Sequence, residues 1–375
     1  MRIALYNLTT TTQPGGIETF NRELARALAG RGHTVHIYGG RCGAIQDIPP
    51  GISVHLYPYI RRERVPDFGS RFRKLVERVS FGFMSVRDVI KRGYDYIYVS
   101  KSFDIPAALL ASRYMKAKVI FGSGGTEFFP GYKYLVGKVD HFFACSGFNA
   151  SQIEQYCGIR PRVLPNGVNT ELFMPVEPPA ELLRKLRLSA ADSVIVSACR
   201  LVGWKGIQYA IGAVARLLKE GYDVRYMIIG DGENRRALEA LAQDLGVRDN
   251  VLFLGNMKNS ELPNYYSLAK IAVFPSIGVE TFGISIAEAM SCGVPVISTK
   301  TGGIPEVVAE GTGLLVPPGD ESALSDAVKA LIADSALRET MGRAGRRRII
   351  ENFSWDVIVR RFEISLENTV TAEGR

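Results

Sequence analysis

Short apolar runs alternate with stretches of helical periodicity along almost the whole chain. Runs such as 194–196 and 226–229 are continuously apolar, which is typical of strands that helices bury on both faces. The candidate strands are 2–7, 34–38, 53–57, 96–100, 118–121, 141–145, 162–164, 193–198, 226–229, 251–254, 271–274, 295–298 and 313–316. The candidate helices include 17–29, 206–220, 233–244, 283–292 and 321–333. This alternation predicts α/β domains with parallel, doubly wound sheets.

The length of the chain, 375 residues, favours two domains of roughly 150–200 residues over a single core. Three prolines fall within residues 173–181, and such a segment is typical of a linker because proline removes donors and disfavours helix before it. We therefore expect a boundary near 170–180, with one domain over 1–172 and another over 173–350. The predicted fold is two Rossmann-like domains that face each other across a cleft, with ligands beyond the carboxyl ends of the strands.

The composition excludes several classes of protein. Hydrophobic residues make up 46% of the chain and charged residues 22%, which argues against disorder. No apolar run reaches the roughly 20 residues of a membrane-spanning helix, and residues 1–7 are expected to form a strand, not a signal peptide. The five cysteines contain no Cys-x-x-Cys pair, which favours a reduced, cytoplasmic protein without a disulfide framework or a structural zinc site.

The net charge of +8 is unevenly distributed, because residues 1–170 carry +11 and residues 171–375 carry −3. The most basic part, residues 61–92, also has apolar residues at helical spacing, which are Phe68, Phe72, Leu75, Val76, Val79, Phe83, Val86 and Ile90. A basic amphipathic helix can lie on an anionic membrane surface. The alternative, which we favour for the apolar face, is a crossover helix packed on the sheet, with its basic face still available to lipid headgroups or a lipid diphosphate. A nucleic-acid partner is not expected, because no zinc-finger spacing, stacking motif or basic tail accompanies the basic residues.

Two strand-to-helix turns have patterns that suit phosphate groups. Gly15 and Gly16 precede a helix, where the backbone can approach an anionic ligand closely, although the pair also fits a plain turn. Arg200 and Lys205 follow the first strand of the second half, and together they can clamp a diphosphate. The alternative is that both are solvated surface cations.

Three acidic residues stand near the ends of later strands. Asp231 resembles part of a divalent-metal site, but we favour a helix-capping role and expect no metal. Glu280 follows a strand and Glu288 lies in the next helix, where carboxylates can accept hydrogen bonds from sugar and ribose hydroxyls. Gly278 and Gly283 give the backbone room to approach a ligand.

The order and spacing of these motifs resemble a retaining GT-B-fold glycosyltransferase of the family 4 type, also called glycosyl transferases group 1. The resemblance covers nearly the whole chain and is strongest at the Glu280-x7-Glu288 run. Its other motifs are Gly15-Gly16-Ile17-Glu18, Arg31-Gly32-His33, Pro165-Asn166-Gly167-Val168-Asn169, Arg200 with Lys205, Gly302-Gly303-Ile304-Pro305-Glu306, and residues 313–320. The resemblance also implies that the C-terminal segment, 351–375, holds a helix over 354–368 that crosses back to the first domain.

The resemblance implies how a donor would be held. Arg200 and Lys205 would bind the donor diphosphate and stabilise the leaving nucleotide, while the Gly15-Gly16 turn would approach the donor from the other domain. Glu280 would contact the transferred sugar and would, with the two cations, be catalytic.

The remaining donor contacts concern the ribose and the sugar. By resemblance Glu288 would bind the ribose, and backbone amides near Phe282 and Gly283 would surround the sugar. Relatives need no metal or cofactor, and the co-substrate would be a UDP- or GDP-linked sugar.

The sequence departs from the family at one position. Relatives often have a histidine after the strand at 118–121, but alignment places Gly124 there, and none of the four histidines is nearby. Ser123, Thr126 and Glu127 are therefore the candidates for the acceptor side of the reaction centre. Glu127 is equally plausible as a helix-start residue.

The expected function is a retaining hexosyltransferase that moves a sugar from a nucleotide sugar to a saccharide or lipid-linked acceptor of the cell envelope. It would act in the cytoplasm or at the inner face of the cell membrane, with attack on the leaving-group face of the sugar. A nucleotide-sugar epimerase or hydrolase of the same architecture is one alternative. A sugar-nucleotide-binding relative that has lost catalysis is another.

Overall fold

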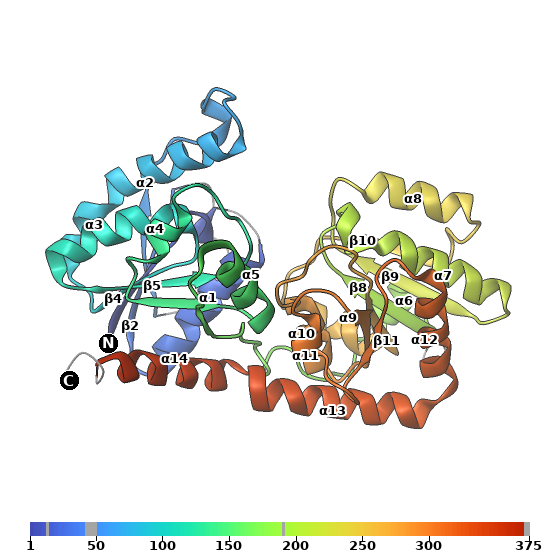
Figure 1. Cartoon of the computed structure of the whole chain (residues 1–375). Coiled ribbons are helices and arrows are strands. Elements are labelled where there is room, and N and C mark those ends of the chain that lie inside the picture. The colour runs from blue at the N-terminus through green and yellow to red at the C-terminus, as the bar shows by residue number, and fades with distance from the viewer. Residues whose placement is uncertain (13–14, 42–50, 190–191, 371–375) are drawn as a thin grey trace. The chain divides into compact units, whose positions relative to one another are not determined.

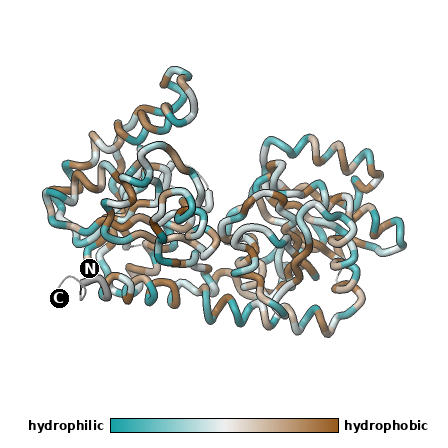
Figure 2. Tube along the Cα trace, in the orientation of Figure 1, coloured by the Kyte–Doolittle hydropathy of each residue, from teal (hydrophilic) through white to brown (hydrophobic). Residues whose placement is uncertain are grey.

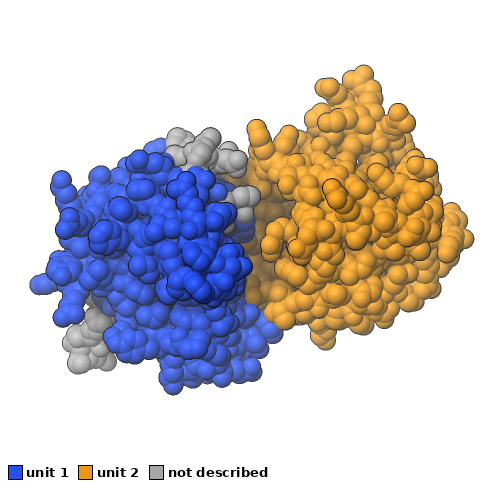
Figure 3. Space-filling model, turned by 90° about the horizontal axis from the view of Figure 1, so that it is seen from above, with its two compact units in different colours: residues 1–167, 355–375 blue, residues 168–354 orange. Residues whose placement is uncertain are grey.

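The structure is a computed structural model, and it describes residues 1–12, 15–41, 51–189 and 192–370. The chain forms two compact units (Figure 3). Unit 1 comprises Met1–Gly167 with Trp355–Arg375, and unit 2 comprises Val168–Ser354. Each unit is an α/β domain built on one parallel sheet (Figure 1).

The sheet of unit 1 has seven parallel strands in the order β3-β2-β1-β4-β5-β6-β7. These strands are β1 (Arg2–Tyr6), β2 (Thr34–Gly40), β3 (Ser53–Tyr57), β4 (Tyr96–Val99), β5 (Lys118–Ser123), β6 (His141–Ala144) and β7 (Arg162–Val163). Every strand predicted from the sequence of this unit is present within two residues of its expected ends. The parallel, doubly wound prediction is therefore confirmed.

Helices cover both faces of this sheet. They are α1 (Gly16–Gly30), α2 (Ser70–Arg92), α3 (Ile105–Met115), α4 (Tyr132–Val136), α5 (Gly147–Cys157) and α14 (Trp355–Val370), with 3-10 turns η1 (Leu8–Thr11), η2 (Arg62–Arg64) and η3 (Ser102–Asp104). Alternate side chains of β1 serve the two faces. Ile3 and Leu5 pack in a core with α1 and α14, whereas Ala4 and Tyr6 pack in a core with α2, α3 and α5. This period of two is what a strand buried on both faces requires.

The sheet of unit 2 has six parallel strands in the order β10-β9-β8-β11-β12-β13. They are β8 (Ser193–Ala198), β9 (Val224–Ile229), β10 (Val251–Gly255), β11 (Ile271–Phe274), β12 (Val296–Thr299) and β13 (Leu314–Val316). The helices are α6 (Ala180–Leu186), α7 (Ile207–Lys219), α8 (Arg235–Asp244), α9 (Leu262–Leu268), α10 (Ile284–Ser291), α11 (Ile304–Val307), α12 (Glu321–Ala333) and α13 (Ser335–Phe353), with the 3-10 turn η4 (Gly203–Lys205). The predicted strands of this half are also present within two residues.

Each sheet has one point where the direction of winding reverses. In unit 1 it lies between the adjacent strands β1 and β4, and in unit 2 between β8 and β11. The loops that follow two such strands diverge, and in open α/β sheets this leaves a place for ligands at the carboxyl ends. The functional candidates after β1, β8 and β11 therefore lie in favourable positions within their own units.

The chain passes between the units at 167/168 and 354/355, not within 173–181. The backbone N–H of Val168 donates to the carbonyl of Phe353 at 2.7 Å, so the chain already belongs to unit 2 at this residue. Phe173 is buried there, and its carbonyl accepts hydrogen bonds from Ser291 and Arg346. The prolines follow the boundary because they sit in a segment that packs on unit 2.

The C-terminal helix α14 is part of unit 1. Its buried side chains Trp355, Ile358, Val359, Phe362 and Leu366 pack in one core with β1, β2 and α1. Glu363 adds an ion pair to Arg31 at 2.7 Å and a hydrogen bond to His33 at 2.7 Å.

Helix α2 differs from the favoured sequence interpretation. Its buried face includes Glu77, Arg78 and Phe81, while Phe72 and Phe83 are exposed. The expectation that its apolar face packs on the sheet is therefore wrong for Phe72, Leu75, Val79 and Phe83, whereas Val86 near the end of the helix is buried. The physical reason is that polar pairs anchor the opposite face: Arg62 binds Glu77 at 2.8 Å, and Arg78 binds Asp104 at 2.6 Å.

Candidate functional site

Lys205 and Glu280 meet at the carboxyl ends of β8 and β11 in unit 2. The Lys205 ammonium forms an ion pair with the Oε1 atom of Glu280, and the two side chains are only 17% and 14% exposed. The ammonium also lies 4.6 Å from the centre of the Trp204 ring, a distance at which a cation is attracted to the aromatic face. The structure thus unites two residues that the sequence placed in separate motifs.

The two loops are joined by their backbones. The amides of Ile277 and Gly278 donate to the carbonyl of Trp204 at 2.8 and 3.1 Å. Gly206 ends η4 with a φ of +71°, and a Cβ atom at this position would lie 1.9 Å from the carbonyl oxygen of Pro275. Glycine is therefore required on conformational and steric grounds. These contacts bring Lys205 to Glu280.

Glu280 is fixed through both its side chain and its backbone. The Ser276 hydroxyl donates to the same Oε1 atom at 3.2 Å, and the Gly303 amide donates to the Glu280 carbonyl at 2.7 Å. Gly302 has a φ of +58°, and a Cβ atom there would meet the same carbonyl oxygen at 2.0 Å. The Gly302-Gly303 turn therefore acts as a backbone support for Glu280.

Arg200 also lies near this pair but, unlike Lys205, it is exposed to solvent. The structure shows no ion pair or side-chain hydrogen bond for it within residues 192–370. All three charges affect the partly buried thiol of Cys199. Desolvation raises its pKa to about 11, Lys205 and Arg200 oppose this rise, and Glu280 adds to it. The three predicted catalytic residues therefore surround the end of β8, with Arg200 available to a ligand.

Glu288, Phe282 and Gly283 surround the start of α10. Gly283 precedes the helix with a φ of +92°, and Phe282 is buried with its ring 5.6 Å from that of Phe353. The side chain of Phe282 is therefore a core group, and its backbone is the part that remains for a ligand. Glu288 is 8% exposed, and its charge adds to burial in raising the pKa of the Tyr266 hydroxyl.

Asp231 does not cap the following helix. Its Oδ1 accepts from the Gly232 amide at 2.8 Å and its Oδ2 lies 3.4 Å from the Arg235 guanidinium, while Asn234 holds the cap position of α8. The capping prediction is wrong, because the turn from Gly230 delays the helix by several residues. In the described parts of the chain, no three His, Cys, Asp or Glu residues are grouped to hold a metal ion.

In unit 1 the Gly15-Gly16 turn supports Glu18, a residue that sequence reasoning did not assign to the site. Glu18 is buried and accepts a hydrogen bond from the Thr9 hydroxyl at 2.6 Å. A Cβ atom at Gly15 would lie 2.3 Å from its Oε2. Gly15 therefore makes room for this carboxylate beside the end of β1. The motif Gly15-Gly16-Ile17-Glu18 contains this carboxylate, although the sequence assigns only its two glycines to the donor site.

A second unpredicted group lies at the carboxyl end of β4. Lys101 follows this strand closely, and burial lowers its pKa, an effect that Glu18 partly opposes. The neighbouring Arg78–Asp104 pair is completed by Asn7, whose Oδ1 accepts from Arg78 at 2.9 Å. Burial raises the pKa of Asp104 to about 6 even though Arg78 lowers it. The available signal was the position of Lys101 beside the reversal point of the sheet.

The loop after β5 contains the three acceptor-side candidates. Ser123 is buried and donates to the carbonyl of Gly125 at 3.0 Å, whereas Thr126 is exposed. Glu127 forms an ion pair with Lys74 of α2 at 2.9 Å. Desolvation raises its pKa, but the Lys74 contact together with the charges of Lys101 and Arg62 outweighs this, so the pKa is lowered. The three candidates thus differ in kind, and Glu127 is poorly suited to act as a base.

Gly124 is the position at which the resemblance leads us to expect a histidine. A Cβ atom at this position would lie 3.4 Å from the Cγ1 atom of Ile17, which is an ordinary contact. The loop therefore packs against the first turn of α1, next to the Gly15-Gly16 motif.

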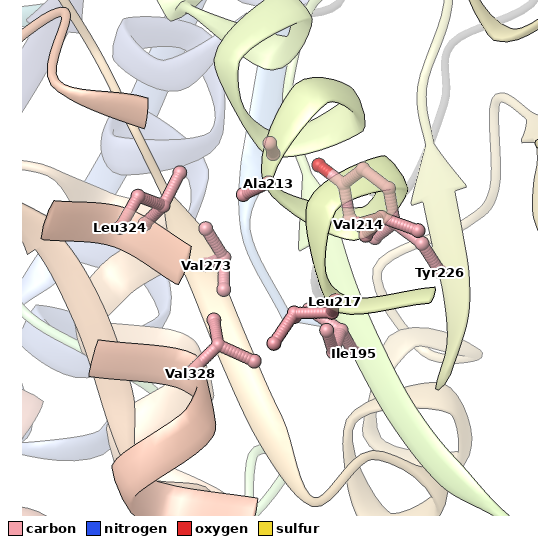
Figure 4. A pocket seen from close by; sticks show the side chains of 9 residues that line it. Ile195, Ala213, Val214, Leu217, Tyr226, Val273, Leu324 and Val328 are labelled. Carbon is pink, nitrogen blue, oxygen red and sulfur yellow. The ribbon is translucent and has the colours of Figure 1, made fainter. Parts of the chain in front are cut away.

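A small apolar cavity lies inside unit 2, between α7, α12 and the sheet (Figure 4). Its lining includes Val214, Leu217, Val273 and Val328, and none of the site residues described above contributes to it. The cavity is a packing feature of the core and not a part of the site.

Two family models match the chain. The model described as "Glycosyl transferases group 1" matches residues 180–348, and the model described as "Glycosyltransferase Family 4" matches residues 14–172. A relative from Corynebacterium glutamicum is 32% identical over 291 residues, which cover 72% of this chain and 75% of the relative. That relative is a GDP-mannose-dependent monoacylated alpha-(1-6)-phosphatidylinositol monomannoside mannosyltransferase.

Two solved structures share the fold. A sucrose-phosphate synthase from Thermosynechococcus elongatus has a TM-score of 0.83 at 24% identity and covers 99% of both chains. Anabaena HepE in complex with UDP has a TM-score of 0.80 at 21% identity, covering 98% of this chain and 100% of that one. With a family model on each half and a relative of this identity, the chain belongs to the group 1 glycosyltransferases of the GT-B fold.

Proposed function

We propose that this glycosyltransferase moves a hexose, with retention of configuration, from a UDP- or GDP-linked sugar to a saccharide or lipid-linked acceptor of the cell envelope. The observation that carries the proposal is the Lys205–Glu280 pair with the exposed Arg200 beside it. A diphosphate leaving group gains negative charge as its bond to the sugar breaks. Fixed cations at that point lower the barrier, because they need no reorganisation during the reaction.

The roles within unit 2 follow from the geometry of each group. Lys205 and Arg200 would bind the donor diphosphate, and the partly buried Lys205 would act with less competition from water. Glu280 keeps Lys205 in place and would accept hydrogen bonds from hydroxyls of the transferred sugar. Glu288, on α10, would bind the ribose. We propose that these cations replace a metal ion in stabilising the leaving group.

The stereochemical proposal is that the acceptor attacks from the leaving-group face of the sugar. A covalent intermediate would need a free carboxylate near the anomeric carbon. Glu280 instead binds Lys205 and Ser276. The acceptor substrate would be held by unit 1, at the carboxyl ends of its strands. There the Glu18 carboxylate can accept hydrogen bonds and the Lys101 ammonium can donate them.

The acceptor class is inferred from the relative and from charge. The Corynebacterium glutamicum relative uses GDP-mannose and a phosphatidylinositol-based acceptor, as its name states. Together with the +11 charge of residues 1–170, this supports a lipid-linked acceptor at an anionic membrane surface, on the cytoplasmic side. No helix of the described residues is both long and apolar enough to cross a membrane.

The proposal is tested with a panel of nucleotide sugars. A donor should raise the midpoint of thermal unfolding, since a ligand selective for the folded state adds stability. The stabilising donor is then supplied with lipid and saccharide acceptors, and the anomeric configuration of the product is determined by NMR. Products of inverted configuration would contradict retention. Epimerisation of the donor without an acceptor would favour the epimerase alternative, and stabilisation without any turnover would favour a binding protein.

A further inference from the structure

The part of α2 up to Phe83 and the segment before it carry an exposed apolar ridge, formed by Phe68, Phe72, Leu75, Val79 and Phe83. Their exposed fractions run from 40% for Phe72 to 82% for Phe83. The steps of three and four residues from Phe72 to Phe83 place these side chains on one side of the helix. In Figure 1 this end of α2 stands away from the sheet of unit 1, and Figure 2 shows hydrophobic residues along it.

The exposure of the ridge is determined by the opposite side of the helix. Phe81 is fully buried there, and Arg78 forms its pair with Asp104 at 2.6 Å. Glu77, which is also buried, binds Arg62 at 2.8 Å. Rotating α2 to bury the ridge would break these buried pairs and leave their charges unpaired, which is strongly unfavourable. The ridge therefore stays on the surface of unit 1.

Cations accompany the ridge. Residues 61–92 contain ten Lys and Arg residues against four Asp and Glu residues. Arg61, Arg64 and Arg87 are exposed, and within residues 51–189 the structure shows no ion pair for them. Arg87 lies one helical turn after Phe83, and Arg61 and Arg64 precede the helix. An exposed apolar ridge on such a basic segment suits a surface that offers both hydrocarbon and negative charge. Anionic phospholipid bilayers have this chemistry at the headgroup boundary.

We propose that the ridge inserts into the headgroup region of an anionic bilayer while Arg61, Arg64 and Arg87 contact lipid phosphates. A second copy of the chain is a less suitable occupant, because a twofold contact through the ridge would bring the same unpaired cations close together. This inference rests on the proposed function, which supplies the reason for attachment to a membrane. The attachment is assigned to inserted apolar side chains as well as to charge.

Vesicle sedimentation tests the ridge directly. Wild-type protein is expected to pellet with vesicles of phosphatidylglycerol and phosphatidylcholine, and far less with phosphatidylcholine alone. The triple variant Phe72→Ser, Val79→Ser, Phe83→Ser should lose about tenfold in partitioning for each aromatic removed. Ile364→Ser is the matched control, since Ile364 is 55% exposed on α14 of the same unit but lies outside the ridge. Equal pelleting of the triple variant and the wild type would overturn the proposal.

Insertion is tested by fluorescence. In a Phe83→Trp variant, the fluorescence of the new tryptophan is obtained by subtracting the emission of the wild type, which comes from Trp204 and Trp355. This fluorescence should shift to the blue with anionic vesicles and be quenched by brominated lipids. Arg64→Gln with Arg87→Gln should weaken attachment and reduce its sensitivity to salt. An unshifted, unquenched emission would show that the ridge does not enter the bilayer. Ridge-dependent dimers in sedimentation velocity, without vesicle binding, would identify a second copy as the occupant.

The ridge and the proposed function can fail separately. Stabilisation by the nucleotide sugar should be the same in the triple variant and the wild type, because the ridge contains no donor-site residue. Vesicle binding without any donor stabilisation would contradict the proposed function and leave the ridge supported. Donor turnover with no ridge-dependent vesicle binding would support the proposed function and contradict the insertion of the ridge.

Discussion

Lys205 and Glu280 are 75 residues apart in the sequence and form an ion pair in unit 2. The pair exists because β8 and β11 are neighbours in the sheet, so that their following loops meet at the carboxyl edge. Neither side chain is fully buried, so each can exchange part of this contact for a ligand. The pairing gives Glu280 a structural role beside its proposed role toward substrate.

Replacing Lys205 by alanine should lower turnover by about 10²–10³-fold, because a preorganised cation at the leaving group is lost. The change leaves Glu280 with Ser276 alone, and the free energy of unfolding should fall by about 1–3 kcal/mol. Turnover is measured in acceptor assays and stability by urea unfolding. Arg200→Ala should lower turnover without the loss of stability, since Arg200 is exposed. Unchanged turnover in Lys205→Ala would contradict the assignment.

Gly302→Ala should disturb Glu280 through the backbone. The added Cβ atom would meet the Glu280 carbonyl oxygen at 2.0 Å at a residue with a φ of +58°. We expect both a loss of more than about 3 kcal/mol in stability and a strong loss of turnover. Gly311→Ala is the control, because Gly311 has a φ of +76° with nothing within 4 Å of the added atom. It should lose only about 1–2 kcal/mol and retain activity. Equal effects of the two variants would argue against the steric explanation.

The contact of Glu363 with Arg31 and His33 should give a pH-dependent contribution to the docking of α14. The hydrogen bond from Arg31 holds the pKa of Glu363 below its usual value of 4.5, although burial opposes this. A carboxyl group whose pKa is depressed on folding stabilises the folded state above its unfolded pKa, and this stabilisation is lost as the pH falls through the folded pKa. The free energy of unfolding of the wild type should therefore exceed that of Glu363→Gln above a pH of about 5, a limit known to about one pH unit. The difference should disappear in acid.

Urea unfolding across this pH range checks the expectation for Glu363. Glu367→Gln is the matched control, because Glu367 is an exposed residue of the same helix. It should show no comparable difference at any pH. A difference for Glu363→Gln that grew in acid would have the wrong sign.

Glu127→Gln should leave the pH dependence of turnover unchanged, because Glu127 forms an ion pair with Lys74 and its pKa is lowered. A loss of no more than a few-fold is expected, and Lys74→Ala should produce a similar loss. Loss of the acidic limb in the pH–rate profile of Glu127→Gln would make Glu127 the base. Ser123→Ala and Thr126→Ala complete the test, since near-wild-type turnover in all three variants would remove this loop from the mechanism.

The local pattern of the sequence determined the elements of this protein. Continuous apolar runs located the strands within two residues, since a strand buried on both faces must be apolar throughout. The order and spacing of Gly15-Gly16, Arg200, Lys205 and Glu280 identified the family. These features depend on neighbours along the chain, and so they can be read without the fold.

Only the tertiary structure decided which residues meet and which faces are buried. The pairing of Lys205 with Glu280 depends on strand order, and the room for Glu18 depends on how α1 begins against β1. The boundary moved to 167/168 because Val168 bonds to Phe353 across a long stretch of sequence. Helix α2 shows the difference most clearly: its periodicity predicted a buried apolar face, but the buried charges Arg78 and Asp104 bind each other and leave Phe72 and Phe83 in solvent. The orientation of a helix follows from the partners of all its sides, and these partners lie far away in the sequence.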